Sequence, residues 1–138
     1  MTSVPSDLRR SERTLALARD VGRRYAGNAP IAISEIGSGL FFLSDFVRNV
    51  DVPCEIDFLS IGGDASAHRF VTDLSRPIDG RDVLVVCDRI DDPQRMSFLL
   101  GALRERAPRS LALVSYEPPA DADRAALGEI AILGDSAS

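Results

Sequence analysis

The sequence predicts an α/β protein with a doubly wound, mostly parallel sheet flanked by helices. Segments with helical spacing of apolar residues alternate with short β-branched runs, the pattern of strand–helix–strand units. The most apolar run, Val83-Leu84-Val85-Val86, carries no polar side chain on either face, as in a central parallel strand. The length of 138 residues fits a single domain, 1–138, with flexible ends expected at 1–6 and 135–138.

The first predicted element is a helix over residues 7–25, which Gly27 ends. Its apolar residues fall mostly on one side. They are Leu8, Leu15, Ala18 and Val21. Six arginines also gather in this segment, and we interpret them as a solvated helix face, with a functional basic patch as the alternative. They are Arg9, Arg10, Arg13, Arg19, Arg23 and Arg24.

The other elements alternate between strand and helix. Apolar runs predict strands at 31–36, 54–61, 68–72, 82–88, 111–114 and 130–133. Helical spacing predicts helices over 39–50 and 93–106. The inward side chains of the helix over 93–106 are expected to be Met96, Leu99, Leu100 and Leu103. Ligands of doubly wound sheets bind beyond the carboxyl ends of the strands, so the functional loops should follow Ile36, Ile61, Asp88 and Val114.

Composition excludes several functions. The net charge is −5 and all 16 basic residues are arginine, so there is no lysine for a Schiff base or a Walker motif. An acidic chain is a poor nonspecific binder of nucleic acid. No apolar run is long enough to span a bilayer, and no apolar segment of a signal peptide follows the polar N-terminus. These features predict a cytoplasmic protein with neither nucleic-acid nor membrane partners.

The two cysteines, Cys54 and Cys87, sit inside apolar stretches. We expect buried, reduced thiols, because free cysteine behaves as a small hydrophobic residue and cytosolic disulfides are rare. A zinc site is not supported, since His68 is the only histidine and no Cys-x-x-Cys motif occurs.

Three stretches, residues 39–58, 69–74 and 78–91, resemble the hypoxanthine-guanine phosphoribosyltransferases. The third is the most specific. Its apolar strand runs into Cys87-Asp88-Arg89-Ile90-Asp91, where the family has the signature Glu-Asp-Ile-Ile-Asp-Thr-Gly-x-Thr. The resemblance implies a type I phosphoribosyltransferase fold and, for an active member, transfer of a phosphoribosyl group from phosphoribosyl pyrophosphate to a purine, with Mg²⁺.

The resemblance also implies roles for individual residues. Asp91 would be the catalytic acid/base, and Asp88 would contact the ribose hydroxyls or a magnesium ion. The two carboxylates together could hold Mg²⁺, although both could instead cap the next helix. Tyr116 stands where the family uses a lysine to read the purine's exocyclic oxygen, which makes it the candidate base-binding residue.

The loop expected to hold the sugar 5′-phosphate departs from the family pattern. Asp92-Pro93-Gln94-Arg95 replaces Thr-Gly-x-Thr. A helix N-terminus attracts anions through free N–H groups, but proline removes one donor. A carboxylate from Asp91 or Asp92 would cap the helix and repel phosphate. Arg95 is the compensating feature, because a guanidinium can pair with phosphate in a fork.

Two further loops are altered. Ile36-Gly37-Ser38, followed by Gly39, replaces the family's pyrophosphate loop Leu-Lys-Gly. This turn could present backbone amides to an anion or could be a plain strand-to-helix turn. Gly62-Gly63-Asp64 stands at the place of a longer mobile lid, and a short lid excludes less water.

Because the core pattern persists while the ligand loops have changed, we expect a phosphoribosyltransferase-like protein that has lost efficient transfer. It would act either as a partner subunit, in a homo-oligomer or with a related chain, or as a binder of a ligand such as phosphoribosyl pyrophosphate or a purine nucleotide. An aromatic cluster could serve an interface or be buried under the first helix. It comprises Phe41, Phe42 and Phe46. The alternatives are an active purine phosphoribosyltransferase with Mg²⁺ and a biosynthetic enzyme that reuses the same crevice.

Overall fold

The computed structural model describes residues 6–37, 39–64 and 67–133. Within them lie the helices α1 (Ser6–Arg24), α2 (Leu40–Arg48), α3 (Pro93–Arg104) and α4 (Asp121–Leu127). The strands are β1 (Ile31–Glu35), β2 (Glu55–Gly62), β3 (Arg69–Thr72), β4 (Asp82–Cys87), β5 (Ser110–Ser115) and β6 (Ala131–Leu133). Of the chain ends expected to be flexible, only Ser6 falls inside the described residues, where it begins α1.

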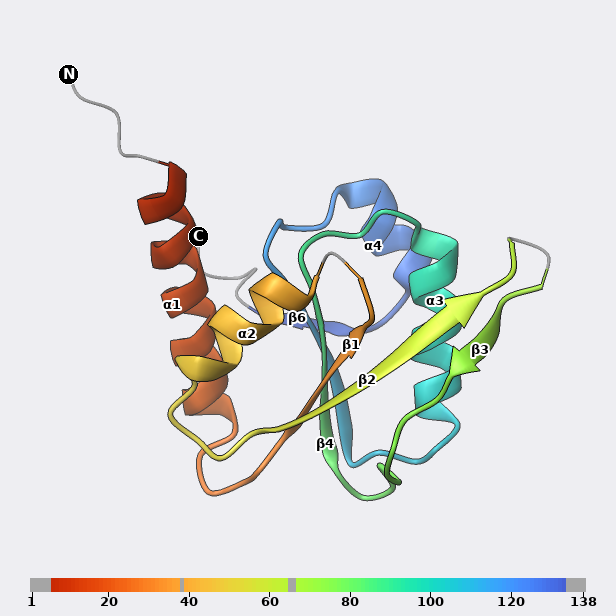
Figure 1. Cartoon of the computed structure of the whole chain (residues 1–138), viewed down its shortest axis with the longest axis horizontal. Helices are drawn as coiled ribbons and strands as arrows, with labels where there is room; N and C mark the ends of the chain where they lie inside the picture. The colour runs from red at the N-terminus through yellow and green to blue at the C-terminus, as the bar shows by residue number, and fades with distance from the viewer. Residues whose placement is uncertain (1–5, 38, 65–66, 134–138) are drawn as a thin grey trace.

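The strands form a six-stranded sheet in the order β3-β2-β1-β4-β5-β6. Every neighbouring pair is parallel except β2 and β3, which are antiparallel. Figure 1 shows α1 and α2 on one side of the sheet and α3 and α4 on the other. The predicted doubly wound, mostly parallel α/β fold is therefore confirmed.

The first core lies between the sheet and the pair α1 and α2. Phe42 and Phe46 of α2 are almost fully buried there, whereas Phe41 is 82% exposed. In α1 the buried residues recur three and four apart. They are Thr14, Leu17, Ala18 and Val21, and Tyr25, directly after the helix, is buried as well. Our placement of Leu15 on this face was wrong: it is 36% exposed, because one residue along a helix turns the side chain by about 100° away from the buried stripe.

The second core fills the opposite face, under α3 and α4. The predicted inward residues Leu99, Leu100 and Leu103 are buried, and Met96 packs at the margin. Strand β4 contributes to both cores, with Leu84 and Val86 facing α1 and α2 and the alternate residues facing α3. Its burial on both faces confirms that it is a central strand.

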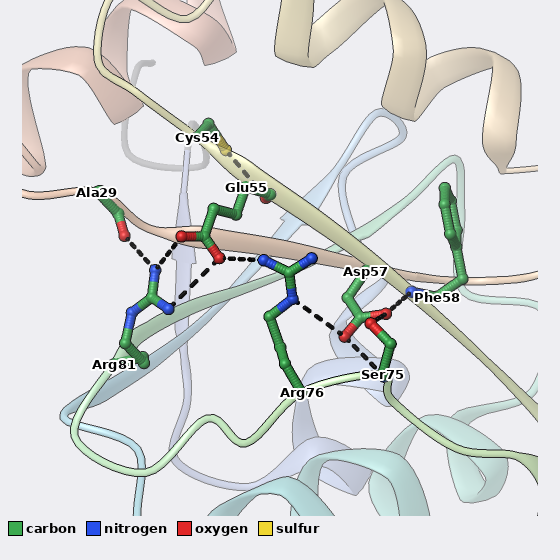
Figure 2. A network of polar contacts seen from close by, with 8 residues as sticks. All are labelled: Ala29, Cys54, Glu55, Asp57, Phe58, Ser75, Arg76 and Arg81. Carbon is green, nitrogen blue, oxygen red and sulfur yellow. Dashed lines mark hydrogen bonds and ion pairs between the residues drawn. The ribbon is translucent and has the colours of Figure 1, made fainter.

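A polar network fixes the segment that leads from β3 to β4 (Figure 2). The buried carboxylate of Asp57 accepts hydrogen bonds from the backbone N–H of Ser75 at 3.0 Å and from its hydroxyl at 3.1 Å. The Glu55 carboxylate pairs with Arg76 at 2.5 Å and with Arg81 at 3.3 Å. Strand β2 is thereby tied to the approach to β4, which helps to fix where the carboxyl end of β4 lies.

Both cysteines are free thiols, but they are partly exposed rather than fully buried as expected. Burial raises the pKa of the Cys54 thiol. Among the described helices, none is long and apolar enough to cross a membrane.

Candidate functional site

A cleft of about 300 Å³ opens at the carboxyl ends of β1 and β4. These two strands are neighbours in the sheet, and the chain proceeds outward from them in opposite directions. Ligands of doubly wound proteins bind at such a switch point. The walls come from the end of β1, the following turn, the loop 88–92 and the first turns of α3. Two of the four predicted loops, those after Ile36 and Asp88, therefore meet in one cleft.

The candidate ribose and metal residue Asp88 is engaged by an arginine from α1. Its carboxylate accepts a hydrogen bond from the Arg10 guanidinium at 2.5 Å, and both side chains are partly exposed. The hydrogen bond with Asp88 is the main reason that the pKa of Arg10 is raised further above its ordinary value. A residue that sequence reasoning assigned to a solvated face thus contacts Asp88 in the cleft wall.

Tyr116, the candidate base-binding residue, belongs to the same contact. The Arg10 guanidinium lies 4.0 Å from the centre of its ring, within range of a cation–π interaction. Arg13 donates to the backbone carbonyl of Tyr116 at 2.8 Å, and the ring meets Phe42 edge-on at 5.6 Å. Tyr116 is therefore packed against α1 and α2 at the margin of the first core.

The candidate acid/base Asp91 and its neighbour Asp92 have separate partners. Asp91 forms an exposed ion pair with Arg89 at 2.8 Å. Asp92 is the N-cap of α3, and its carboxylate accepts hydrogen bonds from the N–H groups of Gln94 at 3.0 Å and Arg95 at 3.3 Å. Of the two predicted capping candidates, Asp92 is the N-cap. The amides of the predicted phosphate loop are thus bound to this chain's own carboxylate.

Arg95, the residue expected to compensate for the altered phosphate loop, pairs with the carboxylate of Glu35 at the end of β1. The same terminal nitrogen also donates to the carbonyl of Ile61 at 2.6 Å. Its Nε atom is buried without a hydrogen-bond partner. The guanidinium therefore joins β1, β2 and α3 at the edge of the cleft. Sequence reasoning assigned no role to Glu35. Its partner Arg95 lies 60 positions away along the chain, so no local sequence pattern indicated the ion pair.

The turn between β1 and α2 forms one wall of the cleft through Gly37 and Gly39, whereas Ser38 lies outside the described residues. The backbone closes a tight turn, with the N–H of Leu40 donating to the carbonyl of Gly37 at 3.2 Å. A Cβ atom at Gly39 would lie 3.6 Å from the hydroxyl of Ser34 and 3.7 Å from the backbone nitrogen of Asp88. This turn and the Asp88 loop are thus in close contact.

The shortened lid is a hairpin that joins β2 to β3. At Gly63 φ is +88°, and an added Cβ would lie 2.0 Å from the carbonyl of Ala67. The N–H of Ala67 also donates to the carbonyl of Asp64 at 3.0 Å. The described part of this loop is therefore held tightly.

Cys87 occupies the position of the glutamate that leads the family signature. Burial is the main cause that raises the pKa of its thiol to about 11. The described residues contain no group of three or more His, Cys, Asp or Glu side chains that could hold a metal ion. The carboxylates of Asp88 and Asp91 each face an arginine instead, so the donor set does not fit the magnesium ion that the resemblance implies.

Solved structures of hypoxanthine-guanine phosphoribosyltransferases share this architecture. The enzyme from Bacillus anthracis superposes with a TM-score of 0.76 at 23% sequence identity, over 83% of this chain and 70% of that one. The strand order and the cleft at the switch point thus belong to a type I phosphoribosyltransferase fold. No family model matches the sequence.

Sequence relatives agree with the fold. The hypoxanthine-guanine phosphoribosyltransferase of Mycobacterium avium is 31% identical over 134 residues, which cover 88% of this chain and 66% of the relative. The bifunctional protein TilS/HprT of Listeria monocytogenes is 29% identical over 110 residues, 75% of this chain and 17% of that protein. The chain thus spans less than two thirds of these relatives' lengths. It belongs to the hypoxanthine-guanine-type phosphoribosyltransferase family.

Proposed function

We propose that this chain is a member of its family that no longer transfers phosphoribosyl groups efficiently and that acts as a binding or partner subunit. One observation carries the proposal: each of the four carboxylates that line the cleft is already engaged by this chain's own groups. Glu35 pairs with Arg95, Asp88 with Arg10 and Asp91 with Arg89. Asp92 binds the first amides of α3.

These pairings matter because phosphoribosyl pyrophosphate is a multiply charged anion. It needs unoccupied cations or N–H donors, which are supplied most readily by arginine, lysine and helix N-termini. The chain has no lysine, and both arginines that line the cleft are in ion pairs. To admit the anion, the protein would have to break an existing pair or displace the cap of α3, and the energy needed would weaken binding.

A second feature supports a role through association with another chain. Ile56 and Phe58 of β2 share the sheet face of Ala32 and Ser34, their partners in β1. Helix α2 packs on β1 and β4, and on that same face Phe58 is 40% exposed and Val71 of β3 63% exposed. Exposed apolar surface of this kind marks protein interfaces. We propose that a second phosphoribosyltransferase-fold chain, identical or related, covers it.

The catalytic part of the proposal is tested with radiolabelled hypoxanthine or guanine, phosphoribosyl pyrophosphate and Mg²⁺. We expect no nucleotide above the level without protein. Clear nucleotide formation that Asp91→Asn abolishes would refute the proposal and establish the active alternative, in which Asp91 is the acid/base.

The association is tested by light scattering on the full chain, whose monomer mass is 14.9 kDa. We expect a dimer that Val71→Asp converts to a monomer, while Leu15→Asp on the exposed side of α1 leaves the dimer intact. A wild-type monomer would exclude self-association and direct the search to a related chain.

A further inference from the structure

We infer that Arg10 is a built-in counter-ion on the carboxylate that the family resemblance assigns to Mg²⁺, so that the cleft operates without a divalent cation. The guanidinium lies 2.5 Å from Asp88 and covers the ring of Tyr116. The inference concerns ions rather than transfer, so it does not depend on the proposed loss of activity.

The donor set around Asp88 is poor for a divalent cation. Mg²⁺ prefers an octahedral set of oxygen ligands, usually including one or two carboxylates. The residue before Asp88 is Cys87, and sulfur is an unsuitable ligand for Mg²⁺. The other candidate carboxylate, Asp91, points to Arg89. That pair is largely exposed and would yield easily, so the Arg10–Asp88 pair decides whether a cation can enter.

Arg10 is held in place by the docking of α1. One turn further along the helix, Arg13 donates to the carbonyl of Tyr116 at 2.8 Å and to the carbonyl of Ser115 at 3.3 Å. The hydroxyl of Thr14 donates to the carbonyl of Arg10 at 2.9 Å. The two Arg13 hydrogen bonds anchor α1 to the carboxyl end of β5. The Arg10 guanidinium is therefore presented to Asp88 by a docked helix.

A fixed positive charge at hydrogen-bond distance from a carboxylate opposes a second cation on that carboxylate. The repulsion acts at a partly exposed position, where water screens charges less than in bulk solvent. The guanidinium also occupies Oδ1 of Asp88, one of the two carboxylate oxygens that a metal ion could use. An anion that this cleft accepts should therefore bind without a Mg²⁺ bridge to Asp88.

The test is a titration of the full chain with Mn²⁺, followed by the electron paramagnetic resonance signal of free Mn²⁺. We expect no specific binding to the wild type or to Arg10→Lys, which keeps the positive charge. Arg10→Gln should bind a single Mn²⁺ at least tenfold more tightly than the wild type does. The double variant Arg10→Gln/Asp88→Asn should lose this gain in affinity. Circular dichroism verifies that each variant is folded.

Two outcomes would overturn the inference: Mn²⁺ binding by the wild type that Asp88→Asn abolishes, or a folded Arg10→Gln variant that gains no binding. If Arg10→Gln does not fold, the comparison of the wild type with Asp88→Asn decides alone. Nucleotide formation by the wild type in excess EDTA would contradict the proposed loss of transfer but agree with this inference. Formation that requires Mg²⁺ and Asp88 would contradict both.

Discussion

The carboxylate of Glu35 and the guanidinium of Arg95 form an ion pair that joins the carboxyl end of β1 to the first turn of α3. Both residues line the cleft. The pair therefore lies between the turn after β1 and the start of α3, the two segments that the sequence resemblance assigns to the pyrophosphate and the phosphate. Two groups that could have faced a ligand from opposite walls instead face each other.

Releasing Arg95 should restore affinity for anions. In Glu35→Gln the guanidinium loses its charged partner and can pair with a phosphoryl group in a fork. We expect inorganic pyrophosphate to bind at least tenfold more tightly than to the wild type, as measured by calorimetry. The variant should fold, because a partly exposed ion pair contributes about 1 kcal/mol or less. Glu129→Gln, which removes the same charge between α4 and β6, is the control, and equal affinities in all three proteins would contradict the prediction.

Removing the cap of α3 should lower stability. Asp92→Ala loses the two hydrogen bonds to the amides of Gln94 and Arg95, at an expected loss of about 1 kcal/mol in the free energy of unfolding. Asp92→Ser retains an acceptor oxygen and should keep most of that stability. Urea denaturation measures both variants. Equal losses in the alanine and serine variants would show that the carboxylate does not act as a cap.

The ion pairs of Glu55 should make stability depend on pH in the acid range. Hydrogen bonds from Arg81 and then Arg76 lower the pKa of Glu55 from its ordinary value of 4.5. A carboxyl group whose pKa is lower in the folded state stabilises the fold above its unfolded pKa and loses that contribution as pH falls through its folded pKa. The pKa of Asp73 is lowered in the same direction, chiefly by the hydrogen bond from Arg106.

We therefore expect the free energy of unfolding to fall as the pH drops below 4.5, and to fall less steeply in Glu55→Gln. Denaturant titrations at neutral pH and in acid measure this difference. Glu129→Gln serves as the control for removing a carboxylate. Identical slopes in the wild type and Glu55→Gln would show that the network in Figure 2 does not hold the Glu55 charge.

Gly63 should be the least replaceable glycine of the β2–β3 hairpin. Gly63→Ala combines a positive φ with a Cβ placed 2.0 Å from a backbone oxygen, so we expect a loss of at least about 2 kcal/mol. Gly80→Ala is the matched control, because φ is +70° there but no atom lies within 4 Å of the added Cβ. Its loss should be only about 1 kcal/mol. Equal losses from thermal denaturation would contradict the steric account.

The fold could be predicted because its signals are local. The β-branched run 83–86 predicted a strand buried on both faces, and the regular alternation of helices and strands predicted a parallel sheet. A cap from either Asp91 or Asp92 could also be predicted, since an N-cap depends on residues two and three positions away, and the structure selects Asp92. The misplaced Leu15 shows the limit of periodicity, because one residue of error moves a side chain out of the buried stripe.

The partners within the cleft could not be predicted, because they are distant in sequence. Arg10 contacts Asp88 across 78 positions and Arg95 contacts Glu35 across 60. Nothing local distinguishes Arg10 from the other arginines of α1. Its role follows from how α1 docks against the carboxyl ends of β4 and β5. Sequence reasoning predicted which loops have changed, whereas the structure shows which groups of this chain bind their polar side chains and amides.

The most direct test of the account is a calorimetric titration of the wild-type chain with phosphoribosyl pyrophosphate in the presence of Mg²⁺. We expect no saturable heat, because the carboxylates and arginines that line the cleft are already bound to other groups of this chain. The matched variant changes Asp88 and Asp91 to asparagine and leaves Asp92, Glu35 and Arg95 intact. Stoichiometric binding by the wild type that this variant loses would contradict the account.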